Sequence, residues 1–181
     1  MKLGSTIVLE KTAGGLNSGA LGKFLAKTLK VAGLRGAVSV LITSDTKIRN
    51  LNSTFRRKNS TTDVLSFPAA AANGFVGDIA ISVDIARKNA RALGHSLNDE
   101  VRILILHGIL HLAGYDHEND RGEMEQKETE LRKRLGLPTG LIERSSRNST
   151  FGVGRSSFGK SLQSKRRSQR TRTKDQRLSR T

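Results

Sequence analysis

Positive charge is spread very unevenly along this chain of 181 residues, and its distribution limits which part of the chain can fold. Residues 1–143 contain 20 Lys and Arg residues against 15 Asp and Glu, whereas residues 144–181 contain 12 against one. The second segment has only five apolar residues, so it cannot bury enough surface to offset its self-repulsion and the entropy of folding. We therefore predict a folded domain over residues 1–143 and a basic, disordered tail over residues 144–181.

The overall net charge of +16 indicates a polyanionic partner such as nucleic acid. In the tail, Lys165, Arg166 and Arg167 are consecutive, and such residues bind RNA by releasing counterions from its phosphates. The tail has only two Phe residues that could stack on bases, so we expect any RNA contact there to lack sequence specificity. The alternative is a solvated extension that serves only solubility.

Cysteine is absent from the chain, which excludes disulfides, thiolate nucleophiles and metal sites with Cys ligands. Any metal ion would therefore be bound by His, Asp or Glu. No segment approaches the roughly 20 apolar residues that a transmembrane helix requires, and the first ten residues lack the apolar core of a secretory signal. We expect a cytoplasmic protein without a membrane partner.

The apolar pattern of the first 143 residues alternates between that of strands and that of helices. β-branched runs predict strands at residues 6–9, 38–42, 64–67 and 78–82, with a loop of small residues at 69–77. Apolar spacing and capping residues predict helices at 21–32 after a Ser18 cap, from about Ser44, at 83–93, at 97–113 and at 121–135 after an Asp120 cap. The predicted fold is a small mixed α/β structure, with helices packed on a sheet of about four strands.

Three of the four histidines lie within eleven residues, at His107, His111 and His117. His107 and His111 are four residues apart, so on a helix they share one face and can bind one ion. Gly114 can end that helix in a left-handed conformation, which lets the chain turn back and bring His117 to the same point. Three neutral imidazoles with an open water position form a catalytic zinc geometry. We expect His95, at a turn between two helices, to be structural.

The spacing H-x-x-x-H-x-x-G-x-x-H is that of the metzincin metalloproteases with one difference, because Gly108 replaces the Glu that follows the first His. In those proteases this Glu is the general base that activates water. The pattern therefore predicts a metal site and disfavours peptide hydrolysis by the metzincin mechanism.

A second cluster places three consecutive cations, Arg56, Arg57 and Lys58, between the end of a predicted helix and a predicted strand. An arginine at this place can bind a phosphate as a planar bidentate donor, which a lysine does less well. The alternative is a solvated, charged loop, and composition alone does not decide between the two.

Together these motifs resemble the YbeY family of bacterial and organellar endoribonucleases. The resemblance rests on LNSTFRRKNSTTDVLSFP at residues 51–68, GDIAIS at residues 77–82 and HGILHLAGYDH at residues 107–117. It covers roughly residues 5–137 and leaves out the basic tail. Phe55 stands where the family commonly has Tyr, and Asn59 stands where it commonly has an acidic residue.

The resemblance implies an α+β, zincin-like fold with one metal ion, usually taken as zinc, bound by His107, His111 and His117 at the end of a helix. A site of three histidines also accepts other first-row divalent ions, so the native metal stays open. It also implies that Arg56 lines the cleft and binds the RNA phosphate. The implied activity is cleavage of single-stranded RNA in 16S rRNA 3′-end maturation and ribosome quality control. We therefore expect rRNA and the small ribosomal subunit as partners, and no DNA, with Arg57 and Lys58 as further RNA contacts.

The expected chemistry is metal-assisted hydrolysis of RNA phosphodiesters, in which the ion lowers the pKa of its bound water and polarises a phosphoryl oxygen. Arg56 and the ligand His111 are the expected catalytic residues. Asp63, Asp78 and Asp116 are candidates for a general base or for partners that orient a histidine. A metal-bound hydroxide that needs no base, and an RNA 2′-OH as nucleophile, stay open. So do two other functions, a metalloprotease and a non-catalytic ribosome-binding factor with a structural metal.

Overall fold

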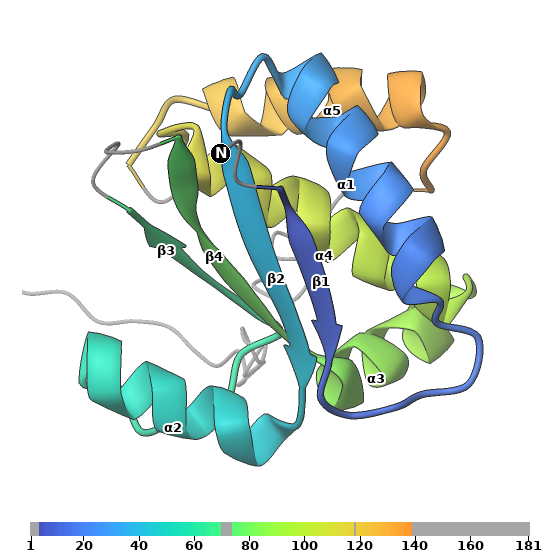
Figure 1. Ribbon diagram of the computed structural model, residues 1–181, viewed down its shortest axis with the longest axis vertical. Coiled ribbons are helices and arrows are strands. Elements are labelled where there is room, and N and C mark those ends of the chain that lie inside the picture. Colours follow the sequence, from blue (N-terminus) through green and yellow to red (C-terminus); the bar gives the residue numbers. More distant parts are fainter. Residues whose placement is uncertain (1–3, 70–73, 118, 139–181) are drawn as a thin grey trace, which may run out of the picture.

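A four-stranded sheet with helices on both faces forms the described part of this computed structural model, which is residues 4–69, 74–117 and 119–138 (Figure 1). The strands are β1 (Thr6–Leu9), β2 (Ala37–Thr43), β3 (Val64–Pro68) and β4 (Phe75–Ser82). The helices are α1 (Ser18–Ala32), α2 (Asp45–Arg56), α3 (Val83–Leu93), α4 (Leu97–Leu112) and α5 (Glu123–Leu135). The predicted α+β class with a mixed sheet of four strands is confirmed. The predicted tail lies outside the described residues.

The strand order is β1-β2-β4-β3, with β1, β2 and β4 parallel and β3 antiparallel to β4. Strand β3 therefore forms one edge of the sheet. It ends at Pro68, which has no N–H to donate and is tolerated at a sheet edge. None of the helices in the described ranges is long and apolar enough to cross a membrane.

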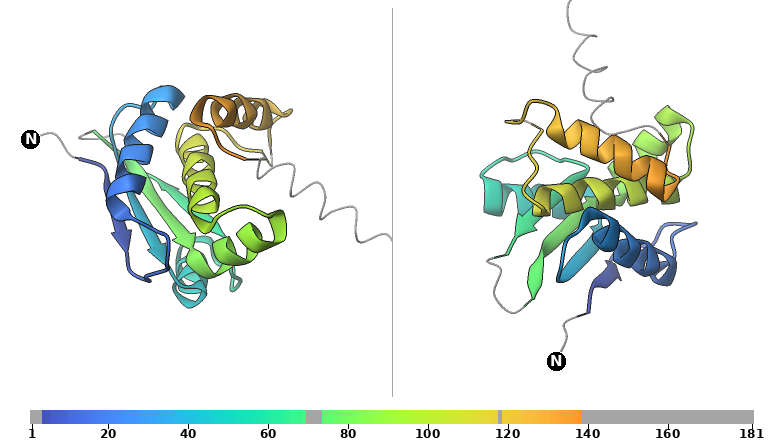
Figure 2. Two further views of the ribbon diagram at one scale, coloured as in Figure 1. Left: turned by 90° about the vertical axis from the view of Figure 1, so that its right-hand side faces the viewer. Right: turned by 90° about the horizontal axis from the view of Figure 1, so that it is seen from above.

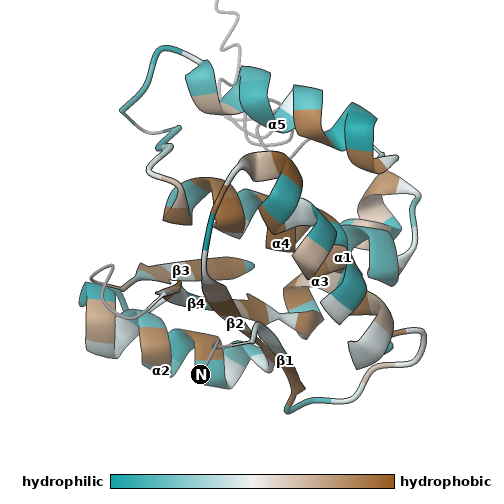
Figure 3. Ribbon diagram, turned by 45° about the horizontal axis from the view of Figure 1, so that its top comes forward, coloured by the Kyte–Doolittle hydropathy of each residue, from teal (hydrophilic) through white to brown (hydrophobic). Residues whose placement is uncertain are grey.

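Helix α4 lies among the other elements because it is apolar on nearly every side. Its residues from Ile103 to Leu110 are all buried, and a helix without a broad polar face is stable only when it is covered all round. It packs on β3 and β4 and is covered by α1, α3 and α5 (Figures 2 and 3). The positions of His107 and His111 are therefore set by packing around the whole helix.

The two faces of the sheet are covered by different helices, as the alternation of side chains requires. Ile79 and Ile81 of β4 belong to the large core that includes α1 and α4. Ala80, between them, belongs to a smaller cluster with Leu65 of β3 and Ile48 of α2. Helix α2 thus lies on the face opposite α4 (Figure 3).

The N-termini of two helices differ from the prediction: α1 has a different capping residue, and α5 begins at a different residue. Asn17, rather than Ser18, caps α1, and its side chain accepts a hydrogen bond from the backbone N–H three residues on at 2.8 Å. Asp120 accepts the N–H of Met124 at 2.8 Å, so α5 begins at Glu123, two residues later than predicted. In both cases an Asx side chain satisfies a helical N–H that lacks an intrahelical partner.

Strand β4 begins at Phe75 rather than at residue 78, so the predicted loop is shorter than expected. Gly77 lies inside the strand with φ +154°, and a Cβ atom there would collide with the carbonyl oxygen of Phe67. A small-residue segment was predicted to be loop, but this glycine permits close strand pairing instead.

Candidate active site

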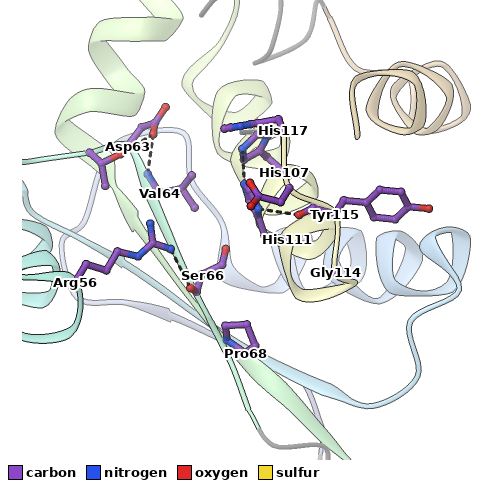
Figure 4. Close-up of a pocket in the computed structure, with 12 residues that line it drawn as sticks. Arg56, Asp63, Val64, Ser66, Pro68, His107, His111, Gly114, Tyr115 and His117 are labelled. Atoms are coloured by element: carbon purple, nitrogen blue, oxygen red, sulfur yellow. Dashed lines mark hydrogen bonds between the residues drawn. The ribbon is translucent and has the colours of Figure 1, made fainter. Parts of the chain in front are cut away.

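The three clustered histidines lie together where α4 ends (Figure 4). Nε2 of His107 is 3.1 Å from Nε2 of His111, and His117 completes the group with its ring centroid 5.2 Å from each of the other two. Gly114, with φ +92°, makes the turn that brings His117 back toward the helix. The predicted convergence of the three side chains is therefore present.

Two of the imidazoles are held in a defined tautomer by oxygen acceptors. His107 Nδ1 lies 2.9 Å from the buried carboxylate of Glu128 on α5, and His111 Nδ1 lies 3.0 Å from the backbone carbonyl of Tyr115. Both acceptors require the proton on Nδ1, so the Nε2 lone pairs of these two rings face the cluster.

The donor set fits a metal ion. One nitrogen from each of His107, His111 and His117 lies within 4.8 Å of the others. Zinc binds imidazole nitrogens at about 2.0–2.1 Å, which places nitrogens in a tetrahedral site a little over 3 Å apart. Nε2 of His107 and Nε2 of His111, 3.1 Å apart, are already close to that spacing, so the donor set suits one ion.

Burial, together with the neighbouring His107 and His117, lowers the pKa of His111 from an ordinary value of 6.5 to about 4. His111 is therefore neutral at pH 7 and has a lone pair available for a metal ion without first losing a proton.

A cavity of about 460 Å³ opens in front of the histidines. Arg56, at the end of α2, lies on the opposite side of this cavity, and its Nη2 donates a hydrogen bond to the carbonyl oxygen of Ser66 at 3.3 Å (Figure 4). The buried Asn52 fixes the loop after α2 by donating to the carbonyl of Ser60 at 2.8 Å. The site thus combines a three-histidine cluster with a guanidinium group across one cavity.

Gly108 is buried where α4 packs against Ile79 of β4. A Cβ atom there would lie 2.9 Å from Cδ1 and 3.0 Å from Cγ2 of Ile79. A Glu at this position would therefore be forced against Ile79 of β4. The packing in this structure therefore leaves no room for the metzincin general base at position 108.

A family model described as Endoribonuclease YbeY matches residues 17–136. The chain is 57% identical over 141 residues to the Endoribonuclease YbeY of Koribacter versatilis, covering 78% of this chain and 92% of that protein. This chain belongs to the YbeY endoribonuclease family. The corresponding protein of Helicobacter pylori is 45% identical over 121 residues, which cover 66% of this chain and 86% of that protein.

A solved structure also matches the YbeY chain. The solution structure of TM1509 from Thermotoga maritima aligns with a TM-score of 0.52 at 26% sequence identity. The alignment covers 84% of this chain and 99% of the Thermotoga maritima protein. The family match and this structural match agree with the fold that the sequence predicted.

The three aspartates considered as general bases do not share one location in this YbeY protein. Asp63 and Asp116 line the histidine cavity. Asp78 precedes the core residue Ile79 in β4, so its side chain is on the opposite face of the sheet, where it lines a second cavity. Only Asp63 and Asp116 are therefore placed to act near the histidines.

Three other predicted residues, Arg57, Lys58 and His95, are not part of the cavity lining. Arg57 ends α2 in a left-handed conformation with φ +56°, and both Arg57 and Lys58 are exposed and outside the cavity lining. His95 pairs with the buried Glu100 at 2.7 Å in the turn between α3 and α4, as a structural histidine would. The predicted RNA contacts Lys165, Arg166 and Arg167 lie outside the described residues.

Sequence analysis missed one residue of the site, Glu128. Glu128 and Arg132 are four residues apart on α5, both are buried, and Oε1 of Glu128 lies 3.9 Å from Nε of Arg132. A signal was present in the sequence, because Glu128 falls in the same helical stripe as Met124 and Leu131, which pack against α4. A carboxylate at a core-facing position must have a buried polar partner, and here that partner is His107.

Proposed function

We propose that this chain is a metal-dependent endoribonuclease that hydrolyses phosphodiester bonds of single-stranded RNA. The observation that carries the proposal is the cavity itself, in which His107, His111 and His117 face Arg56. The names of the related YbeY proteins support the same activity.

His107, His111 and His117 would hold the ion, which we propose to be zinc because three imidazoles with an open position suit it. When bound, the ion supplies Lewis acidity and lowers the pKa of a water molecule. Glu128 and the Tyr115 carbonyl keep the Nε2 atoms of two ligands unprotonated and directed at the cluster.

Arg56 would bind the scissile phosphate and stabilise the negative charge that grows on it in the transition state. Its hydrogen bond to Ser66 holds the guanidinium group near the cavity and leaves further N–H groups for the substrate. Asp63 accepts the N–H of Val64 at 2.9 Å and is a fixed acceptor that could take a proton from the nucleophile, whether water or a 2′-OH.

We further propose that the RNA is 16S rRNA at its 3′ end, bound in the cytoplasm on the small ribosomal subunit, with the basic tail adding affinity. Peptide hydrolysis is less well supported, because the side of α4 at Gly108 has no room for the metzincin base. A non-catalytic ribosome-binding factor would need the metal only for folding.

Metal analysis and cleavage assays on the same preparations test the proposal. The parent protein should retain about one zinc per chain and cut a single-stranded RNA, whereas His111→Ala should lose both properties. Casein should stay intact with the zinc-loaded parent. A His111→Ala protein that still supports 16S rRNA processing in cells would favour the ribosome-binding alternative.

A further inference from the structure

A second cavity, of about 840 Å³, lies on the α2 face of the sheet. Its lining is mainly apolar and includes the side chains of Val8, Leu41, Phe55 and Phe67. Val8 and Phe55 are 50% and 66% exposed, and they are two of the three large hydrophobic residues that are exposed in the described part of the chain. Such a contiguous apolar patch is typical of a binding site.

This second cavity, which we call the Phe55 groove, shares three lining residues with the histidine cavity. Arg56, Ser66 and Pro68 line both. In β3 the side chain of Ser66 is directed at α4, where its hydroxyl donates to the Gly108 carbonyl at 3.4 Å. The next residue, Phe67, is directed to the other face and meets Phe55 edge to face, with ring centroids 5.2 Å apart. The two cavities therefore occupy opposite faces of the sheet and share lining residues at the edge formed by β3.

Arg56 lies at that edge. The carbonyl of Asp63 accepts the backbone N–H of Ser82, and the N–H of Ala69 donates to the carbonyl of Val76. The carbonyl of Ser66, three residues from both Asp63 and Ala69, therefore points away from β4. Arg56 binds this outward carbonyl at 3.3 Å. A polymer that runs from the histidine cavity around the edge of the sheet would therefore contact the guanidinium group of Arg56 before it reached the Phe55 groove.

We propose that the Phe55 groove binds unpaired nucleobases of the RNA that flank the scissile phosphate, with Phe55 as the stacking platform. Two consecutive residues would then bind the two repeating parts of an RNA strand, because Arg56 would bind a phosphate and Phe55 would stack on a base. The exposed carboxylate of Asp78 and the hydroxyl of Ser39 line the groove. A carboxylate repels phosphate but accepts hydrogen bonds from base amino groups, so the groove favours bases over backbone. This inference rests on the proposed function, since it takes the substrate to be single-stranded RNA.

A fluorescence experiment with the full-length, zinc-loaded protein tests the contact. The chain has no Trp, so Phe55→Trp introduces a single indole into the groove. An adenosine RNA decamer should quench its emission in a stopped-flow experiment, before cleavage, and an abasic decamer of the same length should not. Leu93→Trp is the matched control, because Leu93 is 40% exposed and lines neither cavity. Equal quenching of both indoles, or of neither, would overturn the proposal.

Affinity measurements provide a second test that does not depend on the indole. Phe55→Ala should weaken binding of the RNA decamer about tenfold, while binding of the abasic decamer stays the same and Phe55→Tyr restores the parental affinity. An Ala variant that binds the RNA decamer as tightly as the parent contradicts base stacking. If Phe55→Ala weakens RNA binding as expected but the parent protein does not cut RNA, the proposed nuclease function is contradicted while the base-binding groove is supported.

Discussion

The carboxylate of Glu128 lies 2.9 Å from Nδ1 of His107, so a residue on α5 sets the tautomer of a histidine on α4. Both side chains are buried, and the core that joins the two helices contains Leu106, Leu110, Met124 and Leu131. The carboxylate is thus part of the packing between α4 and α5 and acts on the candidate metal site through His107.

Removing this carboxylate should weaken metal binding. Glu128→Ala leaves Nδ1 of His107 without its acceptor, and loss of such a partner typically lowers metal affinity 10–100-fold. Glu128→Gln keeps an oxygen acceptor and should lose less. Competition with a fluorescent zinc chelator measures the affinity, and Glu130→Gln, an exposed position on the same helix, is the control. An unchanged zinc affinity in a folded Glu128→Ala protein would exclude the positioning role.

Arg56→Ala should separate metal binding from catalysis. The guanidinium group bonds to Ser66 and to no histidine in the described structure, so zinc content should be unchanged. Loss of a charge-stabilising donor should lower kcat/KM about 100–1,000-fold, and Arg56→Lys should recover only part of it, since Lys is not bidentate. Single-turnover cleavage of single-stranded RNA measures the effect against Arg49→Ala, an exposed position on α2. Parental activity in Arg56→Ala would refute the phosphate role.

Gly108→Ala should destabilise the fold although alanine is the better helix former. Helix propensity favours the substitution by about 1 kcal/mol, but the new Cβ would lie 2.9 Å from Ile79 Cδ1. Overpacking of this kind costs about 1–3 kcal/mol. Thermal denaturation should therefore show a lower Tm, and Ile79→Val, which removes Cδ1, should restore part of it in the double variant. A Tm above that of the parent would mean that α4 can move away from β4 at little cost.

The metal-free protein should lose stability as the pH falls from about 6.5 to about 4. The pKa of His111 is lowered to about 4 in the folded state, so between these pH values the unfolded chain binds more protons than the folded one. The free energy of unfolding then rises with pH through this window. Urea denaturation at several pH values measures the slope, which should be shallower in His111→Gln. An identical slope in that variant would show that other groups account for the effect.

Neutralising the basic tail should reduce the salt dependence of RNA binding. If Lys165, Arg166 and Arg167 contact phosphates, replacing all three by Gln should lower the slope of log K against log salt by about 2. Anisotropy titrations with single-stranded RNA measure this slope. The charge-matched control replaces Lys23, Lys27 and Lys30, which are exposed on α1, by Gln. An equal change in both variants would show that only net charge matters.

Much of this fold follows from patterns that are local in sequence. The apolar runs predicted all four strands, and helical spacing predicted the centre of each helix. Errors were confined to ends, as at Asn17 and Phe75, where one side-chain cap or one strand pairing shifts a boundary by a few residues. Local rules do not fix the exact end of a helix or strand, because neighbouring residues can satisfy the same backbone groups almost equally well.

The sequence by itself determined the core of the candidate site. The four-residue spacing of His107 and His111 and the glycine at position 114 are sufficient to predict that the three histidines converge, because helix periodicity and a left-handed turn are local properties. Only the tertiary structure decided three further relations. The carboxylate of Glu128 meets His107, the guanidinium group of Arg56 bonds to a carbonyl of the edge strand β3, and Asp78 lies on the other face of the sheet. These relations depend on how α5 and β3 pack against α4. The period of a helix or strand shows which side chains face the core, as for Glu128, but it does not show which residue of a distant segment they meet.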